Sequence, residues 1–404
     1  MDTHADMIAS AEGIEALATE LRKHKVIAFD TEFIRESTFY PVVEIIQVAT
    51  STDTWLVDAQ FFKKKFKSGP QGGFDPAIQP LLDVFTDPAI LKIAHAIQGD
   101  QECLYTSFGV VAKPSFDTAV GASLLGMGDA IGLGKLLQGV LNVIIKKGHA
   151  RTNWSVRPLP PQLIEYAHAD VVHLVELGET LLSGLEKLGR KDWSLTLSSK
   201  WEDSKLYEID VEGIAQKLGR GGRMDRKGFA ALLEMVRWRE MRVRQLNLPR
   251  RWVADDNVLV DLANVRPKTV EHLGSFRGLN KGELKNSGEA ILQALEKSTH
   301  DVVEVSAPKG TRPDIPSPEE AQVLELLKCF VGILADQHKI AAKHLMTSSQ
   351  FLPLLRAELK TPVDLVQAGV LSESAALLIG NELIEFMRGN RALSIINFKV
   401  QIKS

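Results

Sequence analysis

The stretch Val26-Ile-Ala-Phe-Asp-Thr-Glu-Phe33 decides how the rest of this chain is interpreted. Its apolar run has the length of a buried strand and is broken near its end by two acids, Asp30 and Glu32. Residues two apart in a strand point to the same face, so both carboxylates face one spot beside an apolar core. A bound divalent cation is one way to relieve their repulsion and lost hydration. Because a solvated strand-end loop is the commoner setting for such a pair, the rest of the chain must decide.

Length and composition indicate a multidomain globular protein. A chain of 404 residues predicts two or three domains, and 45% hydrophobic with 25% charged residues is the usual globular balance. Cys103 and Cys329 lie far apart without metal-ligand spacing, which indicates a reduced chain without disulfides. The N-terminal residues lack a signal-peptide pattern, and no long apolar run predicts a membrane helix. We therefore expect a cytoplasmic monomer with no membrane contact and no obligate protein partner.

The net charge of −3 hides a basic segment. Residues 219–251 hold ten Lys or Arg against three acids, a local charge of +7, so the remainder of the chain carries −10. A basic segment on a mildly acidic body indicates a polyanionic partner. The candidate contacts are Arg237, Arg239, Arg242, Arg244, Arg250 and Arg251.

The first half of the chain predicts an α/β domain. After a helix over 8–24, strands at 25–33, 43–50 and 55–58 form an antiparallel meander that begins a mixed sheet. From residue 77, helices alternate with strands, which indicates helices covering the sheet. The lysine-rich segment 60–76 favours a solvated loop over a phosphate-contacting one. The glycine-rich segment 126–134 lacks the strand–turn–helix context of a nucleotide-binding loop.

A helix over 160–177 carries a carboxylate in its apolar stripe. Its prolines fit the first turn of a helix, and Asp170 shares a face with Leu163 and Leu174 and lies one turn after Tyr166. A carboxylate among core positions is unusual. The helix pattern leaves two interpretations open, a satisfied buried aspartate or a ligand that faces a site.

The second half predicts helices joined by linkers. Residues 191–224 indicate a helical linker that becomes glycine-rich, and residues 226–298 are helical throughout. The prolines within 301–318 indicate a second linker, and 319–396 predicts further amphipathic helices. Two helical segments of about 75 residues suggest a degenerate repeat.

A fourth acid completes a set. Asp100 lies in the first turn of the helix expected after the strand that ends at His95, at the strand end where open α/β sheets bind ligands. Asp30, Glu32, Asp100 and Asp170 then converge from a strand, a helix start and a helix. Oxygen ligands without His or Cys favour a hard cation, Mg²⁺ or Mn²⁺, over zinc.

These motifs resemble those of the ribonuclease D family. Phe29-Asp-Thr-Glu-Phe33, His95-Ala-x-x-x-Asp100 and Tyr166-Ala-x-x-Asp170-Val are similar to its three exonuclease motifs, within the Tyr-containing subgroup of the DEDD superfamily of 3′–5′ exonucleases. The segments around Phe116 and Asn153-Trp-Ser-Val-Arg-Pro-Leu159 are also similar to the family. The segment with Trp238 resembles an HRDC nucleic-acid-binding domain, whereas residues 319–396 are similar only in length and helicity.

The resemblance implies the domain organisation. It implies a ribonuclease H-like mixed sheet flanked by helices, an α/β exonuclease domain over 1–200, followed by two all-α helical-bundle domains. These are an HRDC-like domain over 201–300 and, after the linker 301–318, a degenerate HRDC-like domain over 319–404. The sequence departs from the family at Asn153, where an acid is expected, and at Glu44, where an apolar residue is usual. Neither change removes a ligand.

The resemblance also implies two-metal-ion phosphodiester hydrolysis. Asp30 is expected to bridge both ions, with Glu32 and Asp170 at the nucleophile side and Asp100 at the leaving-group side, partly through water. Tyr166 is expected to orient the attacking water, because a phenol with a pKa near 10 is a poor base at neutral pH. His95 and His168 are expected to be structural.

The implied substrate is the 3′ end of RNA, with tRNA precursors as the example and nucleoside 5′-monophosphates as products. The basic segment is expected to hold the RNA body through salt-sensitive contacts. Trp238 and Trp252 are candidates for base stacking, although a core position is favoured for Trp238. The alternatives are a DNA-directed exonuclease of the same superfamily and a non-catalytic RNA-binding scaffold, and the intact acid set argues against the scaffold.

Overall fold

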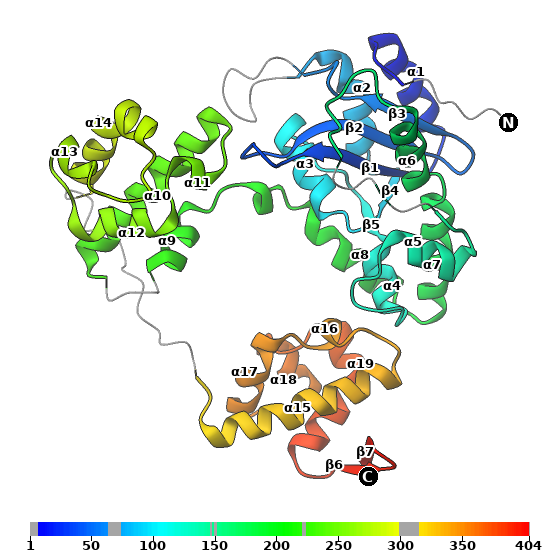
Figure 1. Ribbon diagram of the computed structural model, residues 1–404. Coiled ribbons are helices and arrows are strands. Elements are labelled where there is room, and N and C mark those ends of the chain that lie inside the picture. The colour runs from blue at the N-terminus through cyan, green and yellow to red at the C-terminus, as the bar shows by residue number, and fades with distance from the viewer. Residues whose placement is uncertain are drawn as a thin grey trace.

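A five-stranded mixed sheet organises the first half of the chain in the computed structural model, which describes residues 7–63, 74–145, 148, 152–219, 224–298 and 315–403. The strand order is β3-β2-β1-β4-β5, with antiparallel pairs on the β2 side of β1 and parallel pairs on the β4 side. The predicted meander and mixed sheet are therefore confirmed (Figure 1). The strands are β1 (Val26–Ile34), β2 (Val42–Ala49), β3 (Thr54–Asp58), β4 (Leu91–Ala94) and β5 (Ser115–Asp117).

The two-residue period of β1 separates two cores. Ile27 and Phe29 pack toward one face with residues of the helices at 11–21, 79–86 and 98–108, whereas Ala28 belongs to the core on the other face. Asp30 and Glu32 continue the side of Ala28. The helices of this part are α1 (Ala11–Leu21), α2 (Gln79–Thr86), α3 (Gln98–Phe108), α4 (Thr118–Leu124), α5 (Leu133–Leu141), α6 (Pro161–Val171), α7 (Leu174–Lys187) and α8 (Lys191–Ser199).

Two helix predictions need correction. The helix expected over 160–177 is two helices, because α6 ends at Val171 and α7 begins at Leu174. The start of the expected linker 191–224 is not a linker, since α8 packs against β5 and buries Trp193 and Ser198. The Ser198 hydroxyl accepts the backbone N–H of Asp117 at 3.0 Å, which ties this helix to the sheet.

A second, all-helical part follows with its own apolar core. Trp238 is one of its core residues, 5% exposed, as expected, whereas Trp252 is 52% exposed. The residues Arg220 and Arg223 lie outside the described part of the chain. The helices are α9 (Val211–Gly219), α10 (Arg226–Leu246), α11 (Arg250–Val253), α12 (Asp256–Val265), α13 (Val270–Leu273) and α14 (Lys281–Lys297).

The third part is a helical bundle that ends in a β-hairpin. The hairpin was not predicted, and the expectation of helix is wrong for residues 392–396. Most of the expected linker 301–318, residues 301–314, and Lys64, Lys65 and Lys67 lie outside the described residues. The elements are α15 (Pro318–Gln337), α16 (Ala342–Leu345), α17 (Phe351–Arg356), α18 (Pro362–Gln367), α19 (Glu373–Met387), β6 (Ala392–Ile396) and β7 (Lys399–Lys403).

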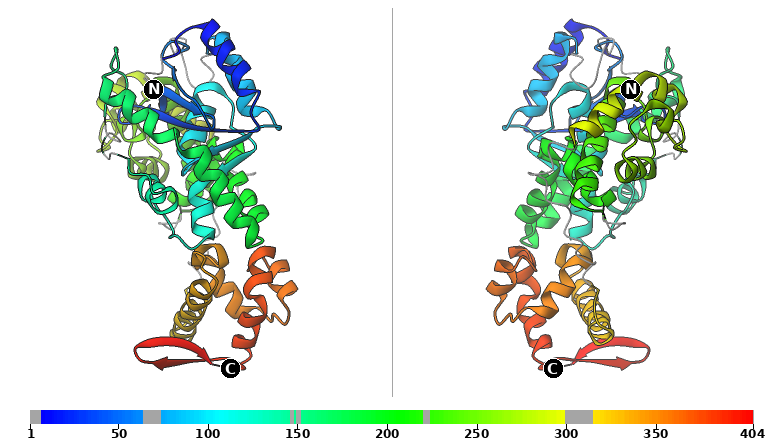
Figure 2. Two further views of the ribbon diagram at one scale, coloured as in Figure 1. Left: turned by 90° about the vertical axis from the view of Figure 1, so that its right-hand side faces the viewer. Right: turned by 90° about the vertical axis from the view of Figure 1, so that its left-hand side faces the viewer.

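Both helical parts contact the sheet domain (Figures 1 and 2). The side-chain amide oxygen of Asn247 accepts the backbone N–H groups of Phe39 and Tyr40 at 3.2 and 3.1 Å. On the other side, the buried Arg190 guanidinium donates to the carbonyls of Leu124 and His338, both at 2.7 Å.

Cys103 and Cys329 are free thiols. Among the described helices, none is both long and apolar enough to cross a membrane. The predicted domain boundaries stay predictions.

Candidate metal centre

Asp30 and Glu32 lie where β1 loses its neighbour on one side. β1 pairs with β4 only from Val26 to Ala28, while its pairing with β2 continues to Ile34. The chain leaves β4 at Ala94 and turns into α3, so the β4 side of β1 is open beside the two acids. This is the end of a parallel strand pair, where open α/β sheets place their ligand sites.

The structure brings three of the predicted acids together. Asp170 on α6 meets Asp30 and Glu32, and one carboxylate oxygen from each lies within 4.8 Å of the other two. Asp170 is 9% exposed, so the helix packing that buries its apolar stripe also carries the carboxylate to the sheet. Of the two interpretations left open for Asp170, the ligand position is the one that this geometry supports.

Asp100 lies beside this group and is held by the strand. Its carboxylate oxygen Oδ1 accepts the Thr31 backbone N–H at 3.0 Å and the Thr31 hydroxyl at 2.5 Å. Because Thr31 has no β4 partner in the sheet, the carboxylate takes the place of a neighbouring strand for its N–H. Asp100 is therefore hydrogen-bonded to Thr31, the residue of β1 that lies between Asp30 and Glu32.

The turn that delivers Asp100 is itself supported by β5. Ala96 has a left-handed backbone, with φ of 56°, which is costly for alanine. The Asp117 carboxylate offsets this cost, since it accepts the N–H groups of Ala96 at 2.8 Å and Ile97 at 3.3 Å. It also caps α4 by accepting the N–H of Ala119 at 2.9 Å.

Burial favours the protonated form of every acid in the group, and repulsion between the carboxylates adds to this for Asp30 and Glu32. Burial, then the charges of Asp100, Asp170 and Glu32, raises the pKa of Asp30 well above its ordinary value. Burial and the neighbouring carboxylates raise the pKa of Glu32 to about 8. Burial raises the pKa of Asp100 to about 7, against the lowering effect of the Thr31 hydrogen bonds, and that of Asp170 to about 6. A cation bound here would lower the pKa of the carboxylates that hold it.

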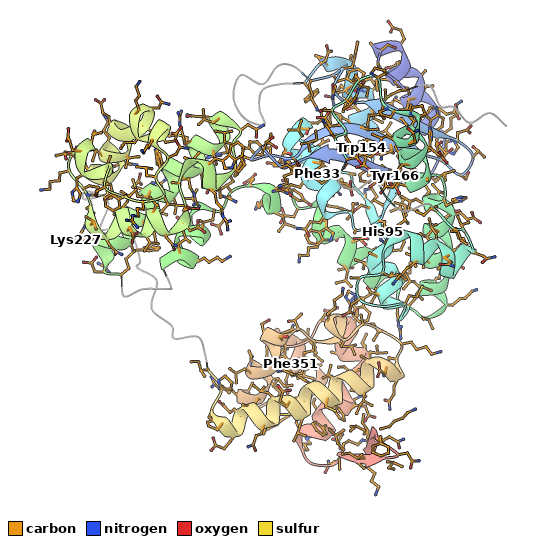
Figure 3. All side chains as sticks on the ribbon, in the orientation of Figure 1. Phe33, His95, Trp154, Tyr166, Lys227 and Phe351 are labelled. Carbon is orange, nitrogen blue, oxygen red and sulfur yellow. The ribbon has the colours of Figure 1, made fainter. Side chains whose placement is uncertain are left out.

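Tyr166 adds a phenol to the same site. Its hydroxyl hydrogen bonds to Asp170, and burial followed by the charges of Asp170 and Glu32 raises its pKa above the ordinary 10.0. Its ring packs on Trp154, with the ring centroids 6.1 Å apart (Figure 3). Tyr166 therefore stays protonated at neutral pH and acts as a hydrogen-bond donor.

The glycine-rich segment forms a wall of the site, which the sequence reasoning missed. A cavity of about 580 Å³ is lined by Tyr166 and Asp170 together with Met127–Lys135, Ile145 and Gly148. The cluster of glycines was the sequence signal for this wall. It does not follow a strand, as a phosphate-binding loop does, so the sequence predicts no role for it. Its place beside the acids comes from the packing of α4 and α7, which no local pattern specifies.

The two histidines and the two departures from the family have local partners. A ring nitrogen of His95 lies 2.9 Å from the Thr118 hydroxyl, and one of His168 lies 2.8 Å from that of Thr54. Glu44, buried in β2, forms an ion pair with Lys63 at 3.1 Å. Asn153 accepts hydrogen bonds from Ser155 within a local turn. These contacts explain the four residues structurally.

Most of the candidate RNA-binding arginines are engaged within the protein. Arg239 is 1% exposed and forms ion pairs with Glu240 and Asp256, so its assignment to an RNA-facing surface needs correction. Its guanidinium satisfies the buried Glu240 and does not face solvent. The other pairs are Arg237 with Glu234, Arg242 with Glu283 and Arg250 with Glu240, and the Arg244 side chain donates to the Glu240 carbonyl. Arg251 is exposed.

Comparisons with known proteins agree on one family. Residues 5–186 match the model of a 3′–5′ exonuclease domain, and residues 229–295 match that of the HRDC domain. Ribonuclease D from Acidiphilium cryptum is 30% identical over 398 residues, which cover 98% of this chain and 96% of that protein. Ribonuclease D from Granulibacter bethesdensis is 30% identical over 364 residues, covering 88% and 87%.

A solved structure has the same fold over the whole chain. RNase D from Escherichia coli, described as an exoribonuclease involved in structured RNA processing, matches with a TM-score of 0.75 at 23% identity. The match covers 96% of this chain and 99% of that one. A protein from Bifidobacterium adolescentis matches with a TM-score of 0.65 at 17% identity. These likenesses concern the fold.

Proposed function

The chain belongs to the ribonuclease D family and is a 3′–5′ exoribonuclease of the DEDD superfamily, and from this premise we propose its substrate and mechanism. The proposed substrates are the 3′ ends of structured RNA such as tRNA precursors, and the products are nucleoside 5′-monophosphates. Support comes from the description of the Escherichia coli relative as an enzyme of structured RNA processing. The proposed cofactors are two divalent ions, Mg²⁺ or Mn²⁺. The cytoplasmic location and the monomeric state stay predictions.

The donor set fits hard divalent cations, on which enzymes of this superfamily depend. Asp30, Glu32 and Asp170 offer carboxylate oxygens within one coordination sphere, and burial makes their uncompensated charges costly. In the proposal, Asp30 would serve both ions, Glu32 and Asp170 would hold the ion on the nucleophile side, and Asp100 would hold the other. The ions supply Lewis acidity, which activates water and stabilises the charge that develops on the phosphate.

The remaining side chains position the reactants. Tyr166, which stays protonated, donates its O–H toward the acids and so orients the attacking water next to Asp170. Thr31 locks one carboxylate oxygen of Asp100, which leaves the other free to face the site. The wall of residues 127–135 confines the terminal nucleotide beside Tyr166. His95 and His168 keep their threonine partners and take no part in proton transfer.

The observation that carries this proposal is the meeting of Asp30, Glu32 and Asp170 at the open edge of β1. The test is incubation of matched single-stranded RNA and DNA, labelled at the 3′ end, with Mg²⁺ or Mn²⁺. We expect loss of 3′ nucleotides from RNA that stops with EDTA and in Asp30→Ala. Absence of metal-dependent loss would overturn the mechanism, and DNA degraded as fast as RNA would overturn the substrate.

A further inference from the structure

The C-terminal hairpin is built as a projecting arm. β6 and β7 pair antiparallel from Ala392 with Lys403 to Ile396 with Lys399. At its root, Leu393 and Ile402 pack against the core of the helical bundle, and β7 contacts α15. From there the arm extends away from the bundle, at the end of the molecule opposite the sheet (Figures 1 and 2).

The tip holds an aromatic residue with a strained backbone and full exposure to solvent. A two-residue turn, Asn397 and Phe398, joins the strands, and both residues have left-handed backbones with φ of 50° and 62°. Asparagine tolerates this conformation, but the second position of such a turn favours glycine, and phenylalanine is strained there. The Phe398 side chain is also fully exposed, at 101%. Phe398 therefore gains no burial within the chain in return for its strain.

Lysines are the charged residues of the arm itself. Residues 386–404 contain four Lys or Arg and no Asp or Glu, although the whole chain has a net charge of −3. Arg388 and Arg391 pair with acids of α19 at the root. Lys399 and Lys403 lie on β7 itself, and Lys399 directly follows Phe398. The arm thus presents a bare aromatic ring next to a positive charge.

We propose that the hairpin tip is an RNA-binding element in which Phe398 stacks on an unpaired base and Lys399 contacts the adjoining phosphate. Aromatic rings beside cations are the usual means by which proteins hold single-stranded nucleic acid without sequence preference. The charge of the arm complements RNA. The inference rests on the proposed function, because it takes RNA as the ligand, and it adds a contact outside the metal centre.

The experiment measures binding of a 5′-fluorescein-labelled stem-loop RNA with a single-stranded 3′ tail to the full-length protein in EDTA. We expect Phe398→Ala to raise the Kd about tenfold, the size of one lost stack. Phe398→Trp should bind as the wild type does. Lys399→Ser should weaken binding and flatten its salt dependence.

Phe398→Gly separates binding from folding. Glycine accepts the left-handed backbone, so this variant should melt at the wild-type temperature or above it and yet bind RNA as weakly as Phe398→Ala. Wild-type binding by the glycine variant would overturn the proposal, because the ring would then be dispensable. A wild-type dimer that Phe398→Ala converts to a monomer would also overturn it, since the tip would contact a second copy.

The outcome is distinguishable from failure of the proposed function. A trinucleotide RNA reaches only the metal centre, so its Mg²⁺-dependent degradation should be equal in Phe398→Ala and the wild type. Loss of stem-loop binding with unchanged trinucleotide cleavage supports the hairpin site. Failure of cleavage in both proteins, with the difference in binding retained, would contradict the proposed function and leave the hairpin site standing.

Discussion

Each acid of the centre owes its role to its surroundings. Asp30 and Glu32 are placed by the two-residue period of one strand, and Asp170 by the buried stripe of α6. Burial deprives all of them of hydration, and hydrogen bonds offset part of this loss, from Thr31 to Asp100 and from Tyr166 to Asp170. The group is therefore poised to release protons when a cation enters, which couples metal binding to pH.

The raised pKa values predict a stability that falls with pH when metal is withheld. The ordinary pKa values are 3.8 for Asp and 4.5 for Glu, whereas in the folded chain they reach about 6 for Asp170, about 7 for Asp100 and about 8 for Glu32. The folded state thus binds more protons than the unfolded state between these limits, and its stability declines as pH rises from about 4 to about 8. Thermal melting in EDTA from pH 5 to 8 measures this.

Mg²⁺ provides the matched control for that series. With saturating Mg²⁺ the carboxylates are neutralised without protons, so the melting temperature at pH 8 should rise, while the effect at pH 5 should be small. A melting temperature in EDTA that rises steadily from pH 5 to 8 would contradict the assignment of raised pKa values to these acids.

Tyr166 should act on turnover rather than on substrate affinity. Tyr166→Phe removes the hydroxyl and keeps the ring that packs on Trp154, so we expect kcat to fall about 10²-fold with little change in KM. Steady-state kinetics on a short RNA measures both constants. Tyr105→Phe is the control, because its hydroxyl bonds to Glu208, at a contact between α3 and the linker to the second part. Equal kcat values for the two variants would argue against the positioning role.

At the scale of elements, the sequence predicts those features that residue spacing within one strand or one helix determines. The strand pattern of β1 and the spacing of Tyr166 and Asp170 suffice to propose the acids, because each period fixes a face. The break between α6 and α7, the wall at 127–135 and the burial of Arg239 depend on contacts between distant elements. The hairpin was missed because its alternation spans only five residues a strand after a long helical run.

Arg190 links α4 to the third part of the molecule. It is 8% exposed and donates to the carbonyls of Leu124, His338 and Lys339. Arg190→Ala leaves these carbonyls without their donor, so we expect a loss of about 2–4 kcal/mol in the free energy of unfolding. Urea unfolding measures this. Lys191→Ala, which removes an exposed ion pair, should change it by less than about 0.5 kcal/mol. Equal losses would contradict the role of Arg190.

At the scale of the whole molecule, fewer basic side chains are open to RNA than the local charge of +7 over 219–251 indicates. Ion pairs with buried acids take up Arg239 and Arg242 of α10 and Arg250 of α11, and the exposed Arg251 stays available beside Trp252. Glu234 and Glu240 lie within this segment, but the pairing of Arg242 with Glu283 of α14 is a contact between distant helices that a basic stretch does not reveal. The RNA-binding role of the remaining arginines stays a proposal.

Exposure predicts which arginine affects RNA binding. Arg251→Ala should weaken RNA binding and reduce the slope of log Kd against log salt by about 1, the effect of one phosphate contact. Arg239→Met should lower the melting temperature and leave the slope unchanged, since the side chain is internal. Binding titrations in EDTA at several salt concentrations measure the slopes. A slope that changes in Arg239→Met and not in Arg251→Ala would reverse this assignment.

The central claim is that Asp30, Glu32 and Asp170 form a divalent metal centre, and calorimetric titration with Mn²⁺ at pH 8 tests it most directly. The wild type and the exposed-acid control Glu15→Gln should bind Mn²⁺ alike. Asp30→Asn should weaken the binding at least about tenfold while the protein stays folded. Mn²⁺ binding by Asp30→Asn that equals the wild type would contradict the account.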